Sequence, residues 1–138
     1  MRVSQRLDYA VRAAVELARL PEGRYEAGAE IAHRLGLPAR FVEQQLSMLG
    51  KHGLVVCRRG SGGGCALARP ADQITVGELV TALEGGYLDA PRVAGSSVST
   101  LWKALGDTMG ELLEGLSLAE LAREQQAIDS ARSSMYYI

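Results

Sequence analysis

The segment between residues 29 and 68 constrains the fold most, because glycines divide it into short elements of different periodicity. Its first two stretches have apolar residues at helical spacing and are separated by Gly36, so we expect two helices joined by a short turn. Pro38 suits the first turn of the second helix, where its missing N–H costs nothing. Such a pair is a helix-turn-helix. The apolar positions are Ala29, Ile31, Ala32 and Leu35, then Phe41, Val42, Leu46 and Leu49.

A β-hairpin is predicted directly after these two helices. Residues 54–58 (LVVCR) read as a strand, residues 59–64 (RGSGGG) as a flexible turn, and residues 65–68 (CALA) as the return strand. A helix-turn-helix followed at once by a hairpin is a winged helix, in which the hairpin forms the wing. The sequence therefore predicts a mostly α fold, with a winged helix-turn-helix domain and a long C-terminal dimerisation helix.

Helices are also predicted on both sides of this segment. One covers residues 4–20. Thr75 and Glu78 form a capping box that opens another, and Ser117 and Glu120 form a second capping box for a last helix that ends near residue 128. The predicted organisation is a winged helix-turn-helix domain over 1–85, a loop at a sensor position over 86–98, dimerisation helices over 97–128 and a tail without periodicity over 129–138.

The helix predicted over residues 97–116 carries apolar residues at spacings of 4, 3, 4, 3 and 4. This is the heptad spacing of a coiled-coil seam. Nothing beside this helix in the sequence is large enough to bury the seam together with Leu101 and Leu113, so we expect a homodimer. The alternative is that the seam covers the core of its own domain. The predicted dimer interface is Val98, Trp102, Leu105, Met109, Leu112 and Leu116.

Charge is distributed unevenly along a chain whose net charge is only −1. Residues 1–69 contain 11 Lys or Arg and 6 Asp or Glu, whereas residues 70–138 contain 4 and 10. Such asymmetry indicates that only the first half faces an anion.

Two parts of this basic half are suited to DNA. Arg58 and Arg59 lie beside a turn without bulk, and arginine enters the narrow, electronegative minor groove. The second helix of a helix-turn-helix lies in the major groove. Its polar face here presents Arg40, Glu43, Gln44, Ser47 and Lys51.

Four stretches together resemble the Rrf2 family of winged-helix transcription regulators. The resemblance covers about residues 1–125 and implies a dimeric bacterial regulator that binds a partly palindromic operator. The stretches are LDYAVRAAVELA (7–18), EIAHRLGLPARFVEQQLSMLGKHGLV (30–55), RRGSGGGCALARP (58–70) and ITVGELVTALEG (74–85).

The resemblance also implies where DNA contacts lie. Arg2, Arg6 and Lys51 are further candidates for phosphate contact on their charge alone, and the alternative is that each is only solvated. As the only Phe, on an apolar stripe with Val42, Phe41 is expected to be core or half-buried rather than a thymine-methyl contact. The implied contacts are Arg40, Phe41, Glu43 and Gln44 to bases, Arg59 in the minor groove, Gly60 and Ser61 against the backbone, and Ser4 to phosphate.

The loop over residues 85–98 departs from the family pattern. Family members that carry an iron–sulfur cluster have three cysteines there, and this chain has none. Iron–sulfur ligation needs thiolates, normally four. Asp8 matches an acidic ligand position of some members but has no cysteine partners. We therefore expect no iron–sulfur cluster, and no metal site of another kind.

Cys57 and Cys65 flank the predicted turn. The chain shows no membrane-spanning segment or secretory signal, so we expect a cytoplasmic protein with reduced thiols. One interpretation is two inert, half-buried thiols. The alternative is a thiol-redox-responsive regulator, in which strand pairing brings the two cysteines within bonding distance beside Arg58 and Arg59.

The leading hypothesis is a homodimeric regulator, acting as a repressor, that responds to an unidentified small-molecule or protein effector. A winged helix used only for protein–protein contact is the alternative from another class, and the basic first half favours DNA. We do not expect an enzyme, because no catalytic carboxylate pair, Ser/His/Asp set or phosphate loop is recognisable. His33 and His52 fall on exposed helix positions.

Overall fold

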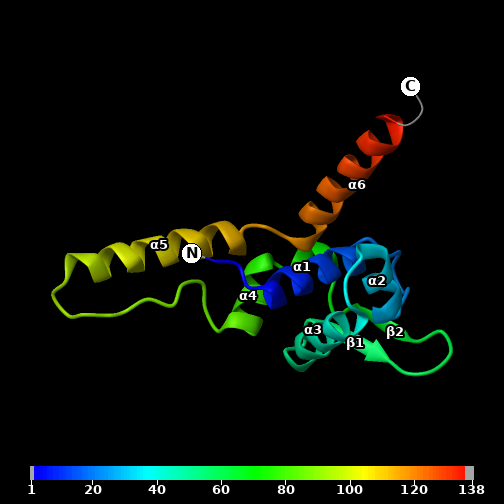
Figure 1. The fold of residues 1–138 in the computed structure, drawn as a ribbon, viewed down its shortest axis with the longest axis horizontal. Coiled ribbons are helices and arrows are strands. Elements are labelled where there is room, and N and C mark those ends of the chain that lie inside the picture. Colours follow the sequence, from blue (N-terminus) through cyan, green and yellow to red (C-terminus); the bar gives the residue numbers. More distant parts are fainter. Residues whose placement is uncertain (1, 136–138) are drawn as a thin grey trace.

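The structure is a computed structural model that describes residues 2–135. It is mostly helical and contains one two-stranded antiparallel sheet, which confirms the predicted winged helix (Figure 1). Its elements are α1 (Gln5–Ala18), α2 (Gly28–Leu35), α3 (Ala39–Lys51), β1 (Val55–Arg58), β2 (Gly64–Leu67), the 3-10 helix η1 (Ala71–Gln73), α4 (Val76–Glu84), α5 (Ser97–Glu114) and α6 (Leu118–Met135).

Short-range capping signals set the helix ends where the sequence predicts them. Gly36 ends α2 in the left-handed conformation, with φ of 68°, which carries no steric penalty in glycine. Thr75 and Glu78 exchange side-chain and backbone hydrogen bonds at 3.1 and 3.0 Å and so begin α4. Ser117 and Glu120 repeat this arrangement before α6.

The core forms around α1, whose buried face is made of small residues. Ala10, Ala13 and Ala14 are completely buried. Small side chains let other helices approach the α1 backbone closely, and α2, α3, α4 and α6 all pack against α1. The larger side chains that fill the core come from these helices and from the connecting segment: Ile31, Val42, Leu46, Leu49, Ile74, Leu79 and Leu118.

The start of α6 belongs to this same core. Leu118 is completely buried, and its N–H donates to the Ile74 carbonyl at 2.9 Å. The Val76 N–H donates to the Leu116 carbonyl at 2.8 Å. The segment predicted to serve dimerisation therefore also closes the core of the winged-helix domain.

The last helix is longer than predicted. It continues to Met135, whereas the sequence predicts an end near residue 128 and an irregular tail. Gln125 donates to Asp129 within the helix, and Asp129 accepts a bond from Arg19 of α1 at 2.7 Å. These polar contacts hold a stretch that has no apolar periodicity, so sequence patterning could not detect it. Tyr136, Tyr137 and Ile138 lie outside the described residues.

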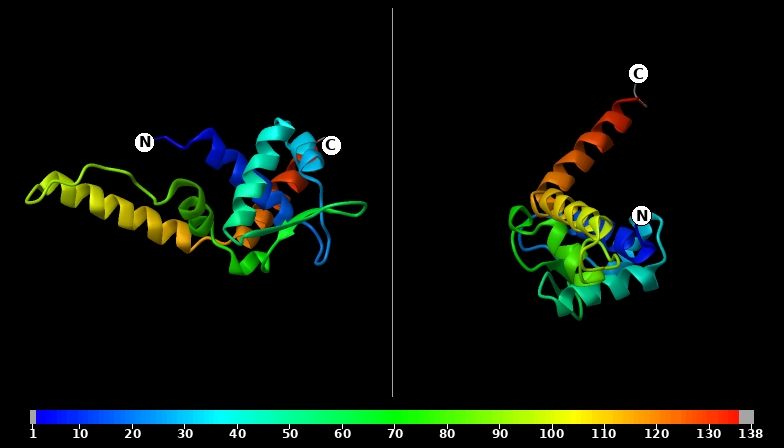
Figure 2. Two further views of the ribbon diagram at one scale, coloured as in Figure 1. Left: turned by 90° about the horizontal axis from the view of Figure 1, so that it is seen from below. Right: turned by 90° about the vertical axis from the view of Figure 1, so that its left-hand side faces the viewer.

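Three parts project from the core. Figures 1 and 2 show α5 extending from one end of the molecule, the hairpin from the other, and the C-terminal part of α6 away from both. Among residues 2–135, no helix has the combination of length and apolar character that a bilayer crossing requires.

One ionic contact joins the start of α1 to the end of α4 and should make the stability of the fold depend on pH. Glu84, at the end of α4, accepts hydrogen bonds from Ser4 at 2.5 Å and Arg6 at 2.9 Å. The hydrogen bond from Ser4, followed by that from Arg6, holds the pKa of Glu84 below its ordinary value. A lowered folded-state pKa contributes stability above the unfolded-state pKa, and that contribution is lost as the pH falls through the folded-state pKa.

We predict that Glu84→Gln lowers the free energy of unfolding by about 0.5 kcal/mol at neutral pH, since solvent screens this exposed pair. The difference from the parent protein should shrink toward zero in acid, where Glu84 of the parent protein is protonated in both its folded and its unfolded state. Urea denaturation at neutral and acidic pH measures both values. Glu124→Gln, on the exposed side of α6, is the control. A deficit that persists unchanged in acid would contradict the assignment.

Candidate nucleic-acid interface

One face of α3 is buried and the other carries the predicted base-reading side chains. Val42, Leu46 and Leu49 fix the buried face, spaced four and three apart. Gln45 also turns inward, which the sequence did not indicate, and its Oε1 has no hydrogen-bond partner among the described residues. The exposed face, whose side chains make no hydrogen bond or ion pair within residues 2–135, consists of Arg40, Glu43, Gln44, Ser47 and Lys51.

Phe41 borders this exposed face and is not a core residue, so of the two expected positions, core or half-buried, the second applies. Its side chain is 50% exposed. The buried stripe runs through Val42 and Leu46, and Phe41 precedes Val42 by one residue, which is about 100° around a helix. Phe41 therefore lies at the edge of the buried stripe, where its exposed half could make a thymine-methyl contact.

The wing has the predicted hairpin form. β1 and β2 pair in an antiparallel register in which Val55 faces Leu67 and Arg58 faces Gly64. Arg59 and Ser61 are exposed in the turn and have no side-chain partner within the described part of the chain. Gly60 adopts φ of 93°, a conformation that residues with a Cβ rarely take. The turn thus needs glycine and presents one unpaired arginine.

The two wing arginines differ in their surroundings. The Arg58 guanidinium lies over the Tyr25 ring, 4.3 Å from its centroid, which is cation–π geometry. Tyr25 thereby fixes Arg58 on the strand, while Arg59 stays available for an external anion. Sequence reasoning did not single out Tyr25, because its role depends on the tertiary approach of residues 24–26 to the hairpin.

That approach is a backbone pairing with the second wing strand. Glu26 and Cys65 exchange both of their backbone hydrogen bonds, at 3.0 and 2.7 Å. The adjacent Gly64, with φ of 128°, comes so close that a Cβ there would lie 2.3 Å from the Glu26 carbonyl carbon. Only glycine allows this contact, which gives the hairpin a third partner segment.

An ionic cluster connects this segment to the helices. Arg34 of α2 bonds to the carboxylates of Glu26 and of the buried Glu16 on α1. The hydrogen bond with Glu26, which outweighs the opposing effect of burial, raises the pKa of Arg34. The wing is therefore linked to α1 and α2 through one shared guanidinium.

The predicted phosphate contacts near the N-terminus are already engaged inside the molecule. The Ser4 hydroxyl caps α1 by accepting the Leu7 N–H at 3.1 Å and donates to Glu84. Arg6 bonds to Glu84 and to the Leu83 carbonyl. A phosphate would have to compete with these bonds, whereas Arg2 is exposed and has no such partner among residues 2–135. His33 and His52 are exposed, as predicted.

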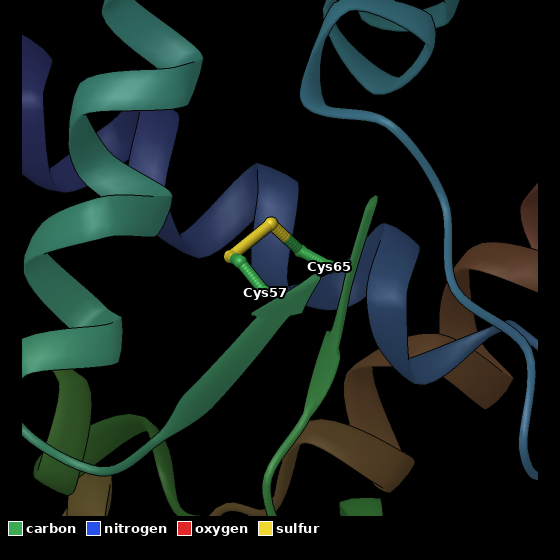
Figure 3. Close-up of a disulfide and its surroundings, with 2 residues drawn as sticks. All are labelled: Cys57 and Cys65. Atoms are coloured by element: carbon green, nitrogen blue, oxygen red, sulfur yellow. A yellow bond between two sulfur atoms is a disulfide. The ribbon is translucent and has the colours of Figure 1, made fainter. Parts of the chain in front are cut away.

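Cys57 and Cys65 face each other across the hairpin and form a disulfide, with Cα atoms 4.1 Å apart (Figure 3). Strand register thus brings together the two side chains that the sequence placed on either side of the turn. The structure differs here from the expectation of two reduced thiols.

The donors on this chain do not fit an iron–sulfur cluster. The loop over residues 85–98 offers no thiolate, and both cysteines are engaged in the wing. No three His, Cys, Asp or Glu side chains within residues 2–135 gather in a way that could hold a metal ion. Asp8, the acidic position considered in the sequence, bonds to Arg12 in the next turn of α1.

The predicted dimer seam is divided between two faces of α5. Tyr87, in the preceding loop, donates to Glu114 at 2.7 Å, and a Cβ at Gly110 would lie 2.8 Å from its ring. Trp102 and Met109 are half-buried on α5, and Trp102 lines a groove between α5 and the preceding loop. Leu116, also half-buried, packs on the domain core.

The outer face of α5 remains apolar and exposed. Leu112 is 69% exposed and Leu101, outside the predicted seam, is 57% exposed. Val98 is likewise exposed, and Leu105 is half-buried on the same side. The open apolar surface of α5 is therefore Val98, Leu101, Leu105 and Leu112.

The close approach at Gly64 leads to a prediction about how the wing is held. We expect Gly64→Ala to lower the free energy of unfolding by about 2 kcal/mol, through both its backbone conformation and the clash with Glu26. Gly62→Ala is the matched control, because Gly62 also has positive φ (75°) but nothing within 4 Å of a Cβ. It should lose about half as much. Urea denaturation followed by circular dichroism measures the difference, and equal losses would contradict a specific contact at Gly64.

Comparisons with known proteins agree with this geometry. A family model described as Rrf2, iron-dependent transcriptional regulator, matches residues 3–124. The HTH-type transcriptional regulator IscR of Cronobacter sakazakii is 34% identical over 138 residues, covering 94% of this chain and 85% of that protein. The chain is similar in structure to CymR, the global cysteine regulator of B. subtilis, with a TM-score of 0.81, 28% identity and coverage of 90% of this chain and 98% of CymR. It is also similar to T. potens IscR, with a TM-score of 0.78, 29% identity and coverage of 91% and 88%. These regulators are not enzymes, and the chain belongs to the Rrf2 family of winged-helix transcriptional regulators.

Proposed function

We propose that this protein is a cytoplasmic, homodimeric repressor that binds a partly palindromic operator and blocks a promoter, without an iron–sulfur cluster. The observation that carries the proposal is the set of unpaired polar and cationic side chains on α3 and the wing tip. Strand β1 packs against α3, and the hairpin carries the wing tip outward from there (Figure 1). Family membership supports DNA as their ligand.

The side chains on α3 suggest a division of roles in the major groove. Arg40 is suited to the O6 and N7 acceptors of guanine, and Gln44 to adenine. Glu43 can accept from the cytosine amino group and repels base edges that present only acceptors. The exposed Phe41 is suited to a thymine methyl. Lys51, at the far end of the helix, would contact phosphate.

The wing would add a minor-groove contact. Arg59 is exposed and unpaired among the described residues, and the turn beside it is nearly free of side chains. Arginine is attracted to the negative potential of a narrow minor groove. Gly60 and Ser61 would then lie against the sugar–phosphate backbone, with Arg58 kept on Tyr25.

Dimerisation would use the open apolar surface of α5. A contiguous apolar surface of this kind marks an interaction site, and a second copy would cover it through a self-complementary interface. Two copies present two α3 helices, which must match half-sites about one helical turn, ~34 Å, apart. A symmetric protein thereby explains why a palindromic operator is expected.

An effector would act by changing the separation or angle of the two α3 helices. The loop between α4 and α5 is the proposed sensing region. It encloses, with α5, a groove of about 1390 Å³ lined in part by Tyr87, Arg92 and Trp102. A small molecule or a partner protein bound there would lie next to the dimer surface, where a small displacement alters the spacing of the half-site readers.

We predict that Arg59→Ala weakens binding to the DNA upstream of the protein's own reading frame about tenfold, or ~1.4 kcal/mol. Fluorescence anisotropy with a labelled duplex measures this, at two salt concentrations and beside a scrambled duplex. Parent binding should prefer the native duplex and weaken with salt, because phosphate contacts release counterions. Arg123→Ala, an exposed arginine on α6, is the control and should leave affinity unchanged.

Two results would count against this assignment. Equal losses in the Arg59 and Arg123 variants would show a general charge effect instead of a wing contact. Absence of salt-dependent binding to any fragment would favour the alternative that the winged helix only contacts other proteins.

The dimer surface gives a separate prediction. Leu112→Asp should convert the dimer to a monomer at micromolar concentration and weaken operator binding, because a carboxylate would be buried without a partner. Ala104→Asp places the same charge on the polar side of α5, near Asp107 and Glu111, and should remain dimeric. Sedimentation velocity measures the mass of each. A Leu112→Asp protein that stays dimeric would exclude this surface.

A further inference from the structure

The position of the wing disulfide follows from the hydrogen-bonding pattern of the hairpin. Both backbone groups of Cys65 bond to Glu26 on its other side, so Cys65 has none left for Cys57. The two cysteines therefore form a non-hydrogen-bonded antiparallel pair, in which opposed Cα atoms lie closest, at about 4.5 Å. Here they are 4.1 Å apart. Strand register alone holds the two sulfur atoms within bonding reach.

The two cysteines differ in how firmly they are held. Cys65 is only 8% exposed and is anchored by its pairing with Glu26. Cys57 lies on the outer strand and is exposed. The Cys57 sulfur is therefore accessible to a reagent from solvent, and the Cys65 sulfur lies at a fixed position beside it.

The surroundings connect this pair to the proposed DNA-reading helix. Both cysteines line a cavity of about 470 Å³ together with Glu43, Ser47 and Lys51 of α3. Figure 3 shows the disulfide between the two strands, with α3 beside it. Lys51 and the adjacent Arg58 favour a thiolate, and the Glu43 carboxylate opposes them. The open cavity admits a molecule as small as hydrogen peroxide.

We propose that Cys57 and Cys65 form a reversible thiol–disulfide site, oxidised by a peroxide and reduced by a dithiol, that sets the affinity of the wing for DNA. This inference rests on the proposed DNA-binding function. It deepens that function by naming the reactant to which the protein responds. A reducing cytoplasm keeps structural disulfides rare, so a bond at this position is suited to regulation.

The reaction balances without any further reactant. The Cys57 thiolate attacks one peroxide oxygen, the O–O bond breaks, and a sulfenic acid forms while the other oxygen leaves as water after taking up a proton. The Cys65 thiolate then attacks the Cys57 sulfur, the S–S bond forms, and the S–O oxygen leaves as a second water. The two thiols lose two electrons, which reduce the peroxide.

The return step uses thiol–disulfide exchange. A dithiol reductant attacks the exposed Cys57 sulfur, and Cys65 leaves as a thiolate. The second thiol of the reductant then attacks the mixed disulfide, releases Cys57 and becomes a disulfide itself. The wing recovers its two thiols, and the two electrons for this reduction come from the dithiol.

The bond would act on DNA binding by ordering the turn. Beyond the cysteine pair, Arg58 pairs with Gly64, and the turn that carries Arg59 is closed by one backbone hydrogen bond, from the Gly63 N–H to the Gly60 carbonyl at 2.9 Å. Short two-stranded hairpins are marginal on their own. The disulfide closes the hairpin just below the turn, so less conformational freedom is lost when Arg59 enters the minor groove. The oxidised form should bind about fivefold to tenfold more tightly.

The test compares oxidised and reduced full-length protein on one labelled duplex from its own upstream region. Oxidation uses hydrogen peroxide that is then removed, and reduction uses dithiothreitol. Mass spectrometry under non-reducing conditions, after alkylation of free thiols, confirms the state of each sample. Fluorescence anisotropy then gives the dissociation constants, with a scrambled duplex beside the native one.

Cys57→Ser is the matched variant, because its side chain is exposed and the substitution should not disturb folding. It also controls for oxidation of the exposed Met48 on α3, which peroxide modifies in both proteins alike. The parent protein should bind fivefold to tenfold more tightly when oxidised, and dithiothreitol should reverse this. The variant should bind equally under both treatments, at the affinity of the reduced parent.

The contrary outcomes are distinguishable. Tight native-duplex binding that is equal in both states would overturn the switch and leave the proposed function standing. Free thiols after peroxide treatment, or tighter binding by the reduced form, would likewise overturn it. Absence of preference for the native duplex in either state would overturn the proposed function and the switch with it.

Discussion

The backbone pairing of Glu26 with Cys65 is the contact on which the functional surface depends. A hairpin of two four-residue strands has too few contacts to hold a fixed orientation in water. Glu26 supplies a third strand-like partner, and its carboxylate is bound by Arg34 on the helix that precedes α3. The wing is thereby fixed relative to the helix-turn-helix, so that one DNA duplex can meet both.

Small residues serve the same purpose in two places. The alanine face of α1 brings the helices of the core together at short distance, which sets the orientation of α3. Gly64 lets the wing strand approach the Glu26 backbone. The large polar side chains that would touch DNA are therefore held in place by close backbone contacts, which the alanines of α1 and Gly64 allow.

Signals that act over a few residues were sufficient to predict most of the fold. Gly36, the Thr75–Glu78 capping box and the glycine-rich turn each determine backbone conformation locally, and the structure confirms the elements that they delimit. Contacts between distant segments were not predictable in this way. Arg6 is bound to Glu84, and Tyr25 lies under Arg58, because the chain folds back on itself. The sequence left open whether Phe41 is core or half-buried, and the structure leaves it 50% exposed beside the buried Val42.

If α3 and the wing of two copies read one operator together, DNA footprinting will show it. Hydroxyl-radical cleavage of the DNA upstream of the protein's own reading frame maps protection at single-nucleotide resolution. Two protected half-sites related by approximate two-fold symmetry are expected, with centres about 10 base pairs or a multiple of that apart. Each should include protection in the minor groove next to the major-groove contact. Uniform protection without defined half-sites, or none at concentrations where the protein is dimeric, would contradict it.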